Sequence, residues 1–507
     1  MSRLICHDPR ETLRNILAKE TDTVKSVLMI AYAFPPEGNA GAYRPLRFVR
    51  HLSRLGWNVN VVAGVPDLFE RYDPGLISQI PPEVRVTRVE GSDLWQTFQA
   101  KRVQRARKAG CNVVNPGDGA ASNGTFRSSL RRAARTIEAW WYHPDMAMPW
   151  IRPGVKVTLE VSACLQPSVL WATAAPVSAF VVAQRASKIL GVPYVLDFRD
   201  AWTISHNEFE ALRPRWARQM DRRNMFRLLE SARAVIFLYE SVAQCFWAAY
   251  RGALTPDQIH VIPNGFEGEV EEPTLPATGG PCRILYTGTL SSYHYHPFLK
   301  ALHKLKTLDA ACAAKLQIGF VGEGMDALAA EAAELDLSDI VQTSEPVTQA
   351  DVLKLQRDTH ALLIFGRPRE MVGHELFAGA KLFGYLKAGK PILGVLPQDE
   401  TRRILEGAGA STVPDIDSVP EIVGALRRLV DASRLGTLAS LVPQRSACIA
   451  YSAEQQIEAL VRALEGRPAH KPFLPGRVSV PASLREVIVE GGWVKQPQRS
   501  SIGSSLR

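Results

Sequence analysis

Residues 362–395 read LLIFGRPREMVGHELFAGAKLFGYLKAGKPILGV, and this stretch decides the fold. Its two short apolar runs, 362–365 and 392–395, have the composition of strands buried in a parallel sheet. Between them, a loop rich in small residues precedes a predicted helix at 381–387, which a glycine ends. Strand, loop, helix and strand make one βαβ step of a Rossmann-like domain. The loop either only connects strand to helix or aims backbone N–H groups at a bound phosphate.

The same order of elements recurs near the start of the chain. A strand is predicted at 26–32, a glycine-bearing loop at 34–45, an amphipathic helix at 46–56 and a second strand at 58–64. The alternation then continues, with strands predicted at 168–172, 194–198, 234–238, 260–262, 283–286 and 316–322, and helices at 179–190, 297–308, 326–335 and 453–464. The predicted fold class is α/β.

A stretch rich in proline, glycine and glutamate, 266–281, separates the two sets of elements. The leading architecture is therefore two Rossmann-like domains that face each other across a cleft. The predicted division is a polar leader (1–23), a first domain (24–270) with a basic insertion (95–150), a linker (271–281), a second domain (282–465) and a poorly ordered tail (466–507).

Composition sets limits on the kind of protein. The residues are 46% hydrophobic and 22% charged, which excludes a wholly disordered chain. A chain of 507 residues is too long for a single hydrophobic core. The seven cysteines are scattered and form no C-x-x-C pair, which predicts a cytoplasmic protein without a disulfide framework or zinc site. The longest apolar run, 169–183, contains Pro176 and is shorter than the ~20 residues that span a bilayer. Any membrane contact is predicted to be peripheral.

Two basic clusters account for part of the net charge of +9. They lie at 101–108 and 127–142, and the second ends in Trp140, Trp141 and Tyr142. Such clusters are either solvated helix faces or a peripheral contact with an anionic membrane on the inner face of the cell membrane. No nucleic-acid module is recognisable, so no nucleic-acid partner is predicted.

Five segments in order resemble the family 4 glycosyltransferases, retaining enzymes of the GT-B fold. They are FPPEGNAGAYRP (34–45), VPYVLDFRDAW (192–202), VIPNGFE (261–267), ILYTGTL (284–290) with FVGEG (320–324), and AGAKLFGYLKAGKPIL (378–393). The resemblance covers about residues 24–465. Within the family, the chain is similar to the bacterial branch that elongates cell-surface polysaccharides or glycolipids. It implies a hexosyltransferase-like enzyme that moves a sugar from a nucleotide-diphosphate sugar to a saccharide or lipid-linked acceptor at the cytoplasmic membrane face. It implies no cofactor and no metal.

The resemblance also implies which residues bind the donor. Glycines in the loops let the backbone approach a diphosphate, and Lys381 is the best cation for it, with a solvated lysine as the alternative. Arg44 is either an anion partner or one half of a surface salt bridge. The full set of implied donor-binding residues is Gly38, Gly41, Arg44, Gly288, Thr289, Gly322, Glu375, Lys381 and Leu382.

The implied catalytic residues are Asp200, Arg199 and Lys381. Arg199 and Asp200 follow a predicted buried strand, where open α/β sheets bind ligands, and as sequence neighbours they point in different directions. Asp200 is expected to hydrogen-bond a sugar hydroxyl, and Arg199 to pair with a phosphate or with a carboxylate of the other domain. A structural ion pair is the alternative.

Three histidines and Asn264 are candidates for contact with the acceptor. His294 and His296 alternate in SSYHYHP, but no third ligand accompanies them, so no metal site is predicted. His206 follows DFRDAWT and is a weaker candidate of the same kind. Asn264 either makes the turn into the linker or contacts the cleft.

Two positions depart from the family pattern. Gly384 stands where the family carries a carboxylate for the ribose hydroxyls, and Thr289 stands where it carries an arginine. Losing a buried charge-assisted hydrogen bond costs about 1.5–3 kcal/mol, or about ten- to a hundredfold in affinity. The alternative hypothesis is therefore a weak or inactive GT-B protein that binds a saccharide or a partner. A sugar epimerase would need converging acidic and histidine residues, which the sequence does not show.

Overall fold

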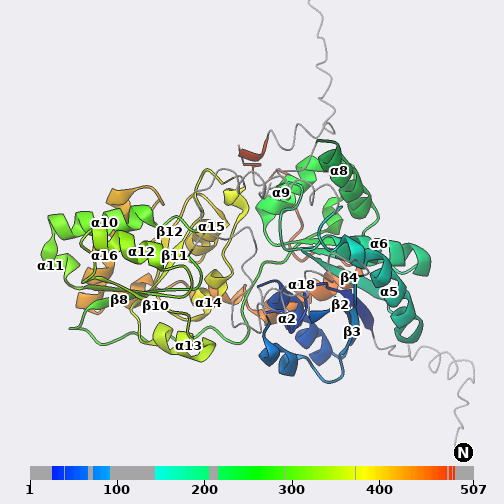
Figure 1. The fold of residues 1–507 in the computed structure, drawn as a ribbon, viewed down its shortest axis with the longest axis horizontal. Helices are drawn as coiled ribbons and strands as arrows, with labels where there is room; N and C mark the ends of the chain where they lie inside the picture. The colour runs from blue at the N-terminus through cyan, green and yellow to red at the C-terminus, as the bar shows by residue number, and fades with distance from the viewer. Residues whose placement is uncertain are drawn as a thin grey trace, which may run out of the picture.

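The computed structural model describes residues 25–38, 40–66, 72–91, 143–204, 215–290, 292–371, 373–410, 412–476, 479–481 and 483–485. The predicted leader, both basic clusters and His206 lie outside these residues. The described chain forms two parallel sheets, each covered by helices on both faces (Figure 1). This confirms the predicted α/β class with two Rossmann-like sheets.

The first sheet has seven parallel strands in the order β3-β2-β1-β4-β5-β6-β7. The chain moves outward from β1 to β3 and then returns to the other side of β1, so its switch point lies between β1 and β4. The strands are β1 (Ser26–Ile30), β2 (Asn58–Gly64), β3 (Arg85–Val89), β4 (Val169–Ala174), β5 (Tyr194–Phe198), β6 (Ala234–Phe237) and β7 (Ile259–Val261).

Alternate residues of β1 enter two different cores, as the period of two in a strand requires. Leu28 and Ile30 pack with the helices of one face, and Val27 and Met29 with those of the other. All four side chains have 0% exposure, which explains why the strand reads as a continuous apolar run. The helices around this sheet are η2 (Pro74–Gln79), α2 (Ala40–Arg54), η3 (Met148–Trp150), α5 (Ile151–Leu165), α6 (Ser178–Leu190), α8 (Arg215–Glu230), α9 (Glu240–Ala249) and η4 (Pro256–Gln258).

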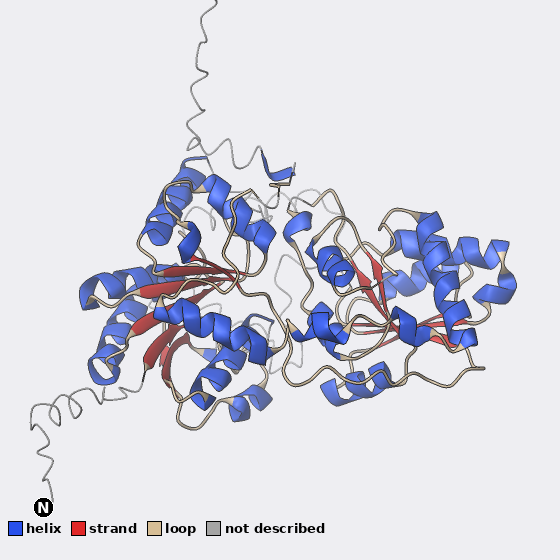
Figure 2. Ribbon diagram, turned by 180° about the vertical axis from the view of Figure 1, so that it is seen from behind, coloured by secondary structure: helices blue, strands red, loops and turns tan. Residues whose placement is uncertain are grey.

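The second sheet has five parallel strands in the order β10-β9-β8-β11-β12. Figure 2 shows the strands of both sheets in red with blue helices around them. Its switch point lies between β8 and β11, which are neighbours although the chain visits β9 and β10 between them. The strands are β8 (Cys282–Thr287), β9 (Leu316–Val321), β10 (Val341–Ser344), β11 (Ala361–Phe365) and β12 (Ile392–Val395). Its helices are α10 (His296–Leu308), α11 (Ala310–Ala313), α12 (Asp326–Glu334), α13 (Gln349–Arg357), η5 (His374–Leu376), α14 (Lys381–Lys387), α15 (Glu400–Gly407), α16 (Val419–Leu435), η6 (Leu438–Leu441) and α17 (Arg445–Ile449).

Helix α2 begins earlier than the sequence predicts. The expected start was residue 46, after Pro45, but the helix begins at Ala40 and contains that proline. A proline inside a helix leaves the carbonyl four residues earlier without its helical donor. Here that carbonyl belongs to Gly41, and the guanidinium of Arg199 donates to it.

The last helix, α18 (Ala453–Glu465), crosses back to the first sheet. It packs against α2 and β6, and Figure 1 shows it in orange beside α2. Its apolar face, including Ile457 and Leu460, is buried in the core formed by β1 and α2. The chain therefore passes between the two sheets twice. The predicted domain boundaries stay predictions, but this helix stabilises the first domain.

The two segments that cross between the sheets, here called the two crossings, are in contact. Phe266 pairs with Ser452 in a parallel bridge, and the N–H of Phe266 donates to the carbonyl of Tyr451 at 3.1 Å. Gly265 lies so close that an added Cβ would sit 2.0 Å from the Tyr451 carbonyl oxygen. Only glycine fits at this position.

The described part of the tail packs against the protein, whereas its composition predicted poor order. Phe473 is 4% exposed and packs against Trp247, and Leu484 is 0% exposed. The amide of Gln244 on α9 holds two backbone groups of this segment, the carbonyl of Leu474 and the N–H of Gly476. Burial of these apolar side chains offsets the entropy lost when the segment is ordered, and the composition of the segment alone does not reveal that burial.

Candidate functional site

The switch point of the second sheet is where an open α/β sheet binds ligands. β8 ends here at Thr287, and the next residue, Gly288, has φ +105°, a backbone conformation that favours glycine. An added Cβ on Gly322, at the end of β9, would lie 2.5 Å from the Gly288 carbonyl oxygen. Both predicted glycines are thus required by the backbone at this edge of the sheet.

Lys381 begins α14 and reaches back to the same edge. Its Nζ lies 2.5 Å from the hydroxyl of Tyr286, and 3.8 Å and 4.8 Å from the ring centroids of Tyr286 and Tyr293. An added Cβ on Gly288 would meet this Nζ at 3.4 Å, so the ammonium borders the Gly288 backbone. Burial lowers the pKa of Lys381 to about 7. Among the described residues no carboxylate pairs with it, and an anionic ligand would restore its charged form.

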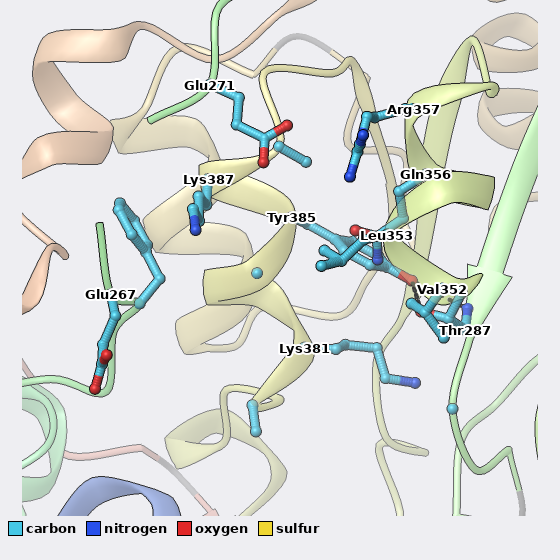
Figure 3. A pocket seen from close by; sticks show the side chains of 15 residues that line it. Glu267, Glu271, Thr287, Val352, Leu353, Gln356, Arg357, Lys381, Tyr385 and Lys387 are labelled. Carbon is cyan, nitrogen blue, oxygen red and sulfur yellow. Dashed lines mark hydrogen bonds between the residues drawn. The ribbon is translucent and has the colours of Figure 1, made fainter. Parts of the chain in front are cut away.

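A cavity of about 530 Å³ adjoins this lysine (Figure 3). Helices α13 and α14, the end of β8 and the linker line it, and Lys381 and Thr287 lie at one end. Gly384 is on its wall, and an added Cβ there would meet nothing within 4 Å. The cavity carries groups of both charges, including Glu267, Glu271, Arg357 and Lys387.

Arg199 and Asp200 follow β5. Arg199 donates to the carbonyls of Ala174, Ala175 and Gly41, which belong to the two segments that flank the switch point of the first sheet. Burial lowers the pKa of Arg199. Its contacts are backbone carbonyls and not the predicted phosphate or carboxylate, so it fixes the shape of the loops. Asp200 is exposed.

Arg44 lies in the interior of the first domain. Its guanidinium pairs with Asp197, and the two side chains are 3% and 0% exposed. It also donates to the carbonyls of Ile262 and Pro263, and its Nη1 is 3.5 Å from Oδ1 of Asn264. This geometry favours the salt-bridge alternative over the predicted anion contact, although the pair is buried rather than at the surface. Asn264 thus lies at the turn into the linker.

Four other predicted donor residues are held by contacts within the protein. Gly41 lies in the first turn of α2, beyond Gly38. Leu382 is fully buried, and its N–H donates to the carbonyl of Gly379, so it offers no free donor to a phosphate. The hydroxyl of Thr289 is 3.4 Å from a carboxylate oxygen of Glu323. Glu375 accepts a hydrogen bond from Ser483 of the tail at 2.7 Å.

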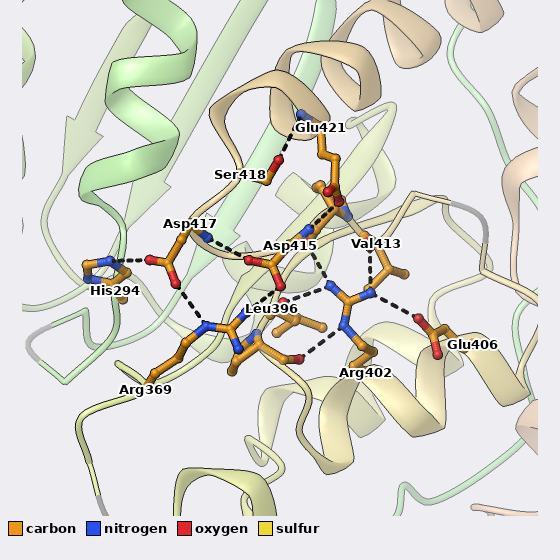
Figure 4. A network of polar contacts seen from close by, with 12 residues as sticks. His294, Arg369, Leu396, Arg402, Glu406, Val413, Asp415, Asp417, Ser418 and Glu421 are labelled. Carbon is orange, nitrogen blue, oxygen red and sulfur yellow. Dashed lines mark hydrogen bonds and ion pairs between the residues drawn. The ribbon is translucent and has the colours of Figure 1, made fainter.

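The two histidines of the SSYHYHP loop pair with carboxylates. Nε2 of His294 lies 3.2 Å from Asp417, and Nδ1 of His296 lies 2.6 Å from Glu331. Asp417 and Asp415 also hold Arg369, which forms a surface network (Figure 4). These contacts explain why the alternating histidines do not converge on one ligand. Among the described residues no group of three or more His, Cys, Asp or Glu could hold a metal ion.

Comparison with solved structures decides the fold. A glycosyltransferase from Rickettsia africae superimposes with a TM-score of 0.57 at 13% identity, over 87% of this chain and 98% of that one. Sucrose-phosphate synthase from Thermosynechococcus elongatus gives 0.54 at 12% identity, over 86% and 98%. HepE of Anabaena, in complex with UDP, gives 0.53 at 16% identity, over 87% and 99%. The chain has the GT-B fold. No protein-family model matches the sequence, and no curated protein matches it by sequence.

In this GT-B protein, the sequence reasoning overlooked Arg367, Tyr286 and Tyr293. Arg367 follows β11 at the switch point, and its position directly after a predicted strand was the available signal. The two tyrosines flank Lys381, and burial raises the pKa of both, so they stay neutral. No helix in the described part of the GT-B chain is long and apolar enough to cross a membrane.

Proposed function

We propose that this GT-B protein transfers a sugar from a nucleotide-diphosphate sugar to a saccharide or lipid-linked acceptor. The observation that carries the proposal is the ammonium of Lys381, buried at the switch point of the second sheet beside Gly288 and without an ion pair to any described carboxylate. A buried cation without a counter-charge is costly, and the diphosphate of a donor supplies that charge. The UDP bound to HepE is consistent with a ligand of this class.

The chemistry we propose is electrostatic. As the bond between sugar and diphosphate breaks, negative charge develops on the leaving diphosphate, and Lys381 stabilises it in a site with little water. Asp200, at the carboxyl edge of the first sheet, accepts a hydrogen bond from a sugar hydroxyl. Arg199 acts through the loops that it holds and not by contact with the substrate. No side-chain nucleophile is required when the leaving diphosphate deprotonates the acceptor on the same face.

The cavity beside α14 is the proposed place of the nucleoside. It opens toward Lys381, and its volume of about 530 Å³ falls within the range of small-molecule sites. Gly384 leaves the cavity wall without the carboxylate that the resemblance predicts. This absence favours the second candidate function, a weak or inactive GT-B protein that binds a saccharide or a partner.

Titration calorimetry separates the two candidates. The wild type is titrated with uridine, guanosine, adenosine and thymidine diphosphates and with their glucose conjugates. We expect micromolar binding of one of them, with an affinity about ten- to a hundredfold lower in Lys381→Ala. Lys300→Ala, an exposed lysine on α10, is the matched control and should bind as the wild type does. If the wild type binds none of these ligands, the transferase proposal is wrong and the non-catalytic candidate gains.

We also propose that the protein works in the cytoplasm, at the inner face of the cell membrane, through the basic clusters at 101–108 and 127–142. Co-sedimentation with vesicles that contain phosphatidylserine should occur at low salt and be lost at high salt. Vesicles of phosphatidylcholine alone are the control. Equal recovery in the supernatant with both kinds of vesicle at low salt would exclude the contact.

A further inference from the structure

Arg367 stands at a position that the proposed function has not yet used. β11 ends at Phe365, and Arg367 comes after Gly366, whose N–H donates to the carbonyl of Val395. Since β11 pairs with β8, the loops after these two strands are neighbours at the switch point. The N–H of His294, in the loop after β8, donates to the carbonyl of Gly366 and ties the two loops together.

The guanidinium of Arg367 has no ion pair among the described residues. It lies 3.7 Å from the centroid of the Phe377 ring, and its Nη1 is 3.7 Å from the Sδ of Met371, a weak acceptor. Its Nε is buried and has no hydrogen-bond partner in the structure. An arginine normally directs its five N–H donors to carboxylates or carbonyls, so this one retains most of its donor capacity.

A neighbouring arginine shows the contrast. Arg369, two residues along the same loop, pairs with both Asp415 and Asp417 (Figure 4). Carboxylates are therefore within reach of this loop, and they neutralise one of its two arginines. The charge of Arg367 remains uncompensated at the edge of the sheet where a ligand binds.

Two neighbouring aromatic side chains, Tyr293 and Phe377, lie between Lys381 and Arg367. The Nζ of Lys381 is 4.8 Å from the centroid of the Tyr293 ring, and this ring is 6.3 Å from the Phe377 ring that carries Arg367. We infer that Arg367 and Lys381 together form a two-cation site for the diphosphate of the donor, in which the fork of Arg367 binds phosphate oxygens. The inference rests on the proposed function and adds to it a second residue that binds the donor.

The electrostatic surroundings of Arg367 agree with this role. Burial lowers its pKa, and the negative charge of Asp200 acts in the opposite direction. Asp200 belongs to the first domain and forms no ion pair with Arg367 in the structure. Two linked phosphates carry more negative charge than one ammonium neutralises, and a bidentate guanidinium matches their geometry.

The test compares three variants by titration calorimetry with the nucleoside diphosphate that the wild type binds best, and with the corresponding nucleoside monophosphate. Arg367→Ala should lower the affinity for the diphosphate about tenfold or more and change that for the monophosphate less. Arg367→Lys, which keeps the charge but not the fork, should recover part of the loss. Arg369→Ala is the matched control and should bind as the wild type does. Thermal unfolding of each variant checks that it is folded.

The outcomes distinguish this inference from the proposed function. If Arg367→Ala binds the diphosphate as tightly as the wild type while Lys381→Ala does not, the inference is overturned and the proposed function stands. An equal loss for diphosphate and monophosphate in Arg367→Ala also overturns it, because a phosphate pair is then not what the guanidinium binds. If the wild type binds no nucleoside diphosphate, both fall together.

Discussion

The carbonyl of Gly41 accepts a hydrogen bond from Arg199 in place of the backbone bond that Pro45 cannot donate. One side chain thus joins the first turn of α2 to the end of β4. Replacement of Arg199 by methionine removes the guanidinium that donates to these carbonyls.

For Arg199→Met we expect a loss of about 2 kcal/mol in the free energy of unfolding, because hydrogen bonds from a charged group are removed. Chemical denaturation measures it. Arg185→Met, an exposed arginine on α6, should stay within about 0.5 kcal/mol of the wild type. Equal stability of the two variants would contradict a role of Arg199 in holding the loops.

The buried pair of Arg44 and Asp197 predicts a strongly non-additive response to mutation. Arg44→Met leaves the Asp197 carboxylate buried without its cation, which should destabilise the protein by about 3–5 kcal/mol. The double variant Arg44→Met/Asp197→Leu should recover much of that loss. Lys156→Ala breaks the exposed pair with Glu160 and should cost less than about 1 kcal/mol. Additive losses in the double variant would mean that the two side chains are not coupled.

Binding of a diphosphate should weaken as the pH rises above about 7. The pKa of Lys381 is lowered to about 7 by burial, so above this pH the free protein must take up a proton to bind an anion. The affinity then falls up to about tenfold per pH unit. Titrations between pH 7 and 9 measure this, because the ligand's own phosphate, with a pKa near 6, is already ionised there. Arg stays charged, so a Lys381→Arg variant with the same slope as the wild type would assign the effect to another group.

The lowered pKa of Lys381 also predicts how the free energy of unfolding changes with pH. Its folded-state pKa is below its ordinary value of 10.5, so the unfolded chain binds more protons between about pH 7 and 10.5. Its contribution to the free energy of unfolding therefore rises with pH across this window. Lys381→Met should remove that rise, and denaturation midpoints at pH 7 and pH 9 compare the two proteins.

Gly384→Glu should strengthen nucleotide binding about tenfold or more if the cavity holds a ribose. The glycine lines the cavity, and an added Cβ meets no atom within 4 Å, so a side chain can start here without a clash. Gly424→Glu is the control, because it is an exposed helical glycine with the same open surroundings. Weaker binding in Gly384→Glu than in the control would place the ribose elsewhere.

Local patterns predicted the strands well and the partners of charged residues poorly. β12 and β2 have the predicted bounds. β12 is the clearer case, because a strand buried on both faces must be apolar throughout. Arg44 and Asp197 are 153 residues apart, and nothing near either of them indicates an ion pair. In the same way, the sequence shows that α18 is amphipathic but not which sheet it covers. Arg367 became a candidate only when the order of the strands placed β11 beside β8.

The contact between the two crossings limits how the GT-B cleft can open. The connection at Phe266 and the connection at Ser452 are bonded side by side, and Gly265 leaves no space between them. Two connecting segments that are bonded at the same place allow the sheets to rotate about that place, but they resist sliding of one sheet past the other. We therefore expect opening and closing to be one hinge motion with its axis near Gly265 and Tyr451. The loops after β5 and β11, which carry Asp200 and Arg367, would approach and separate along a single arc.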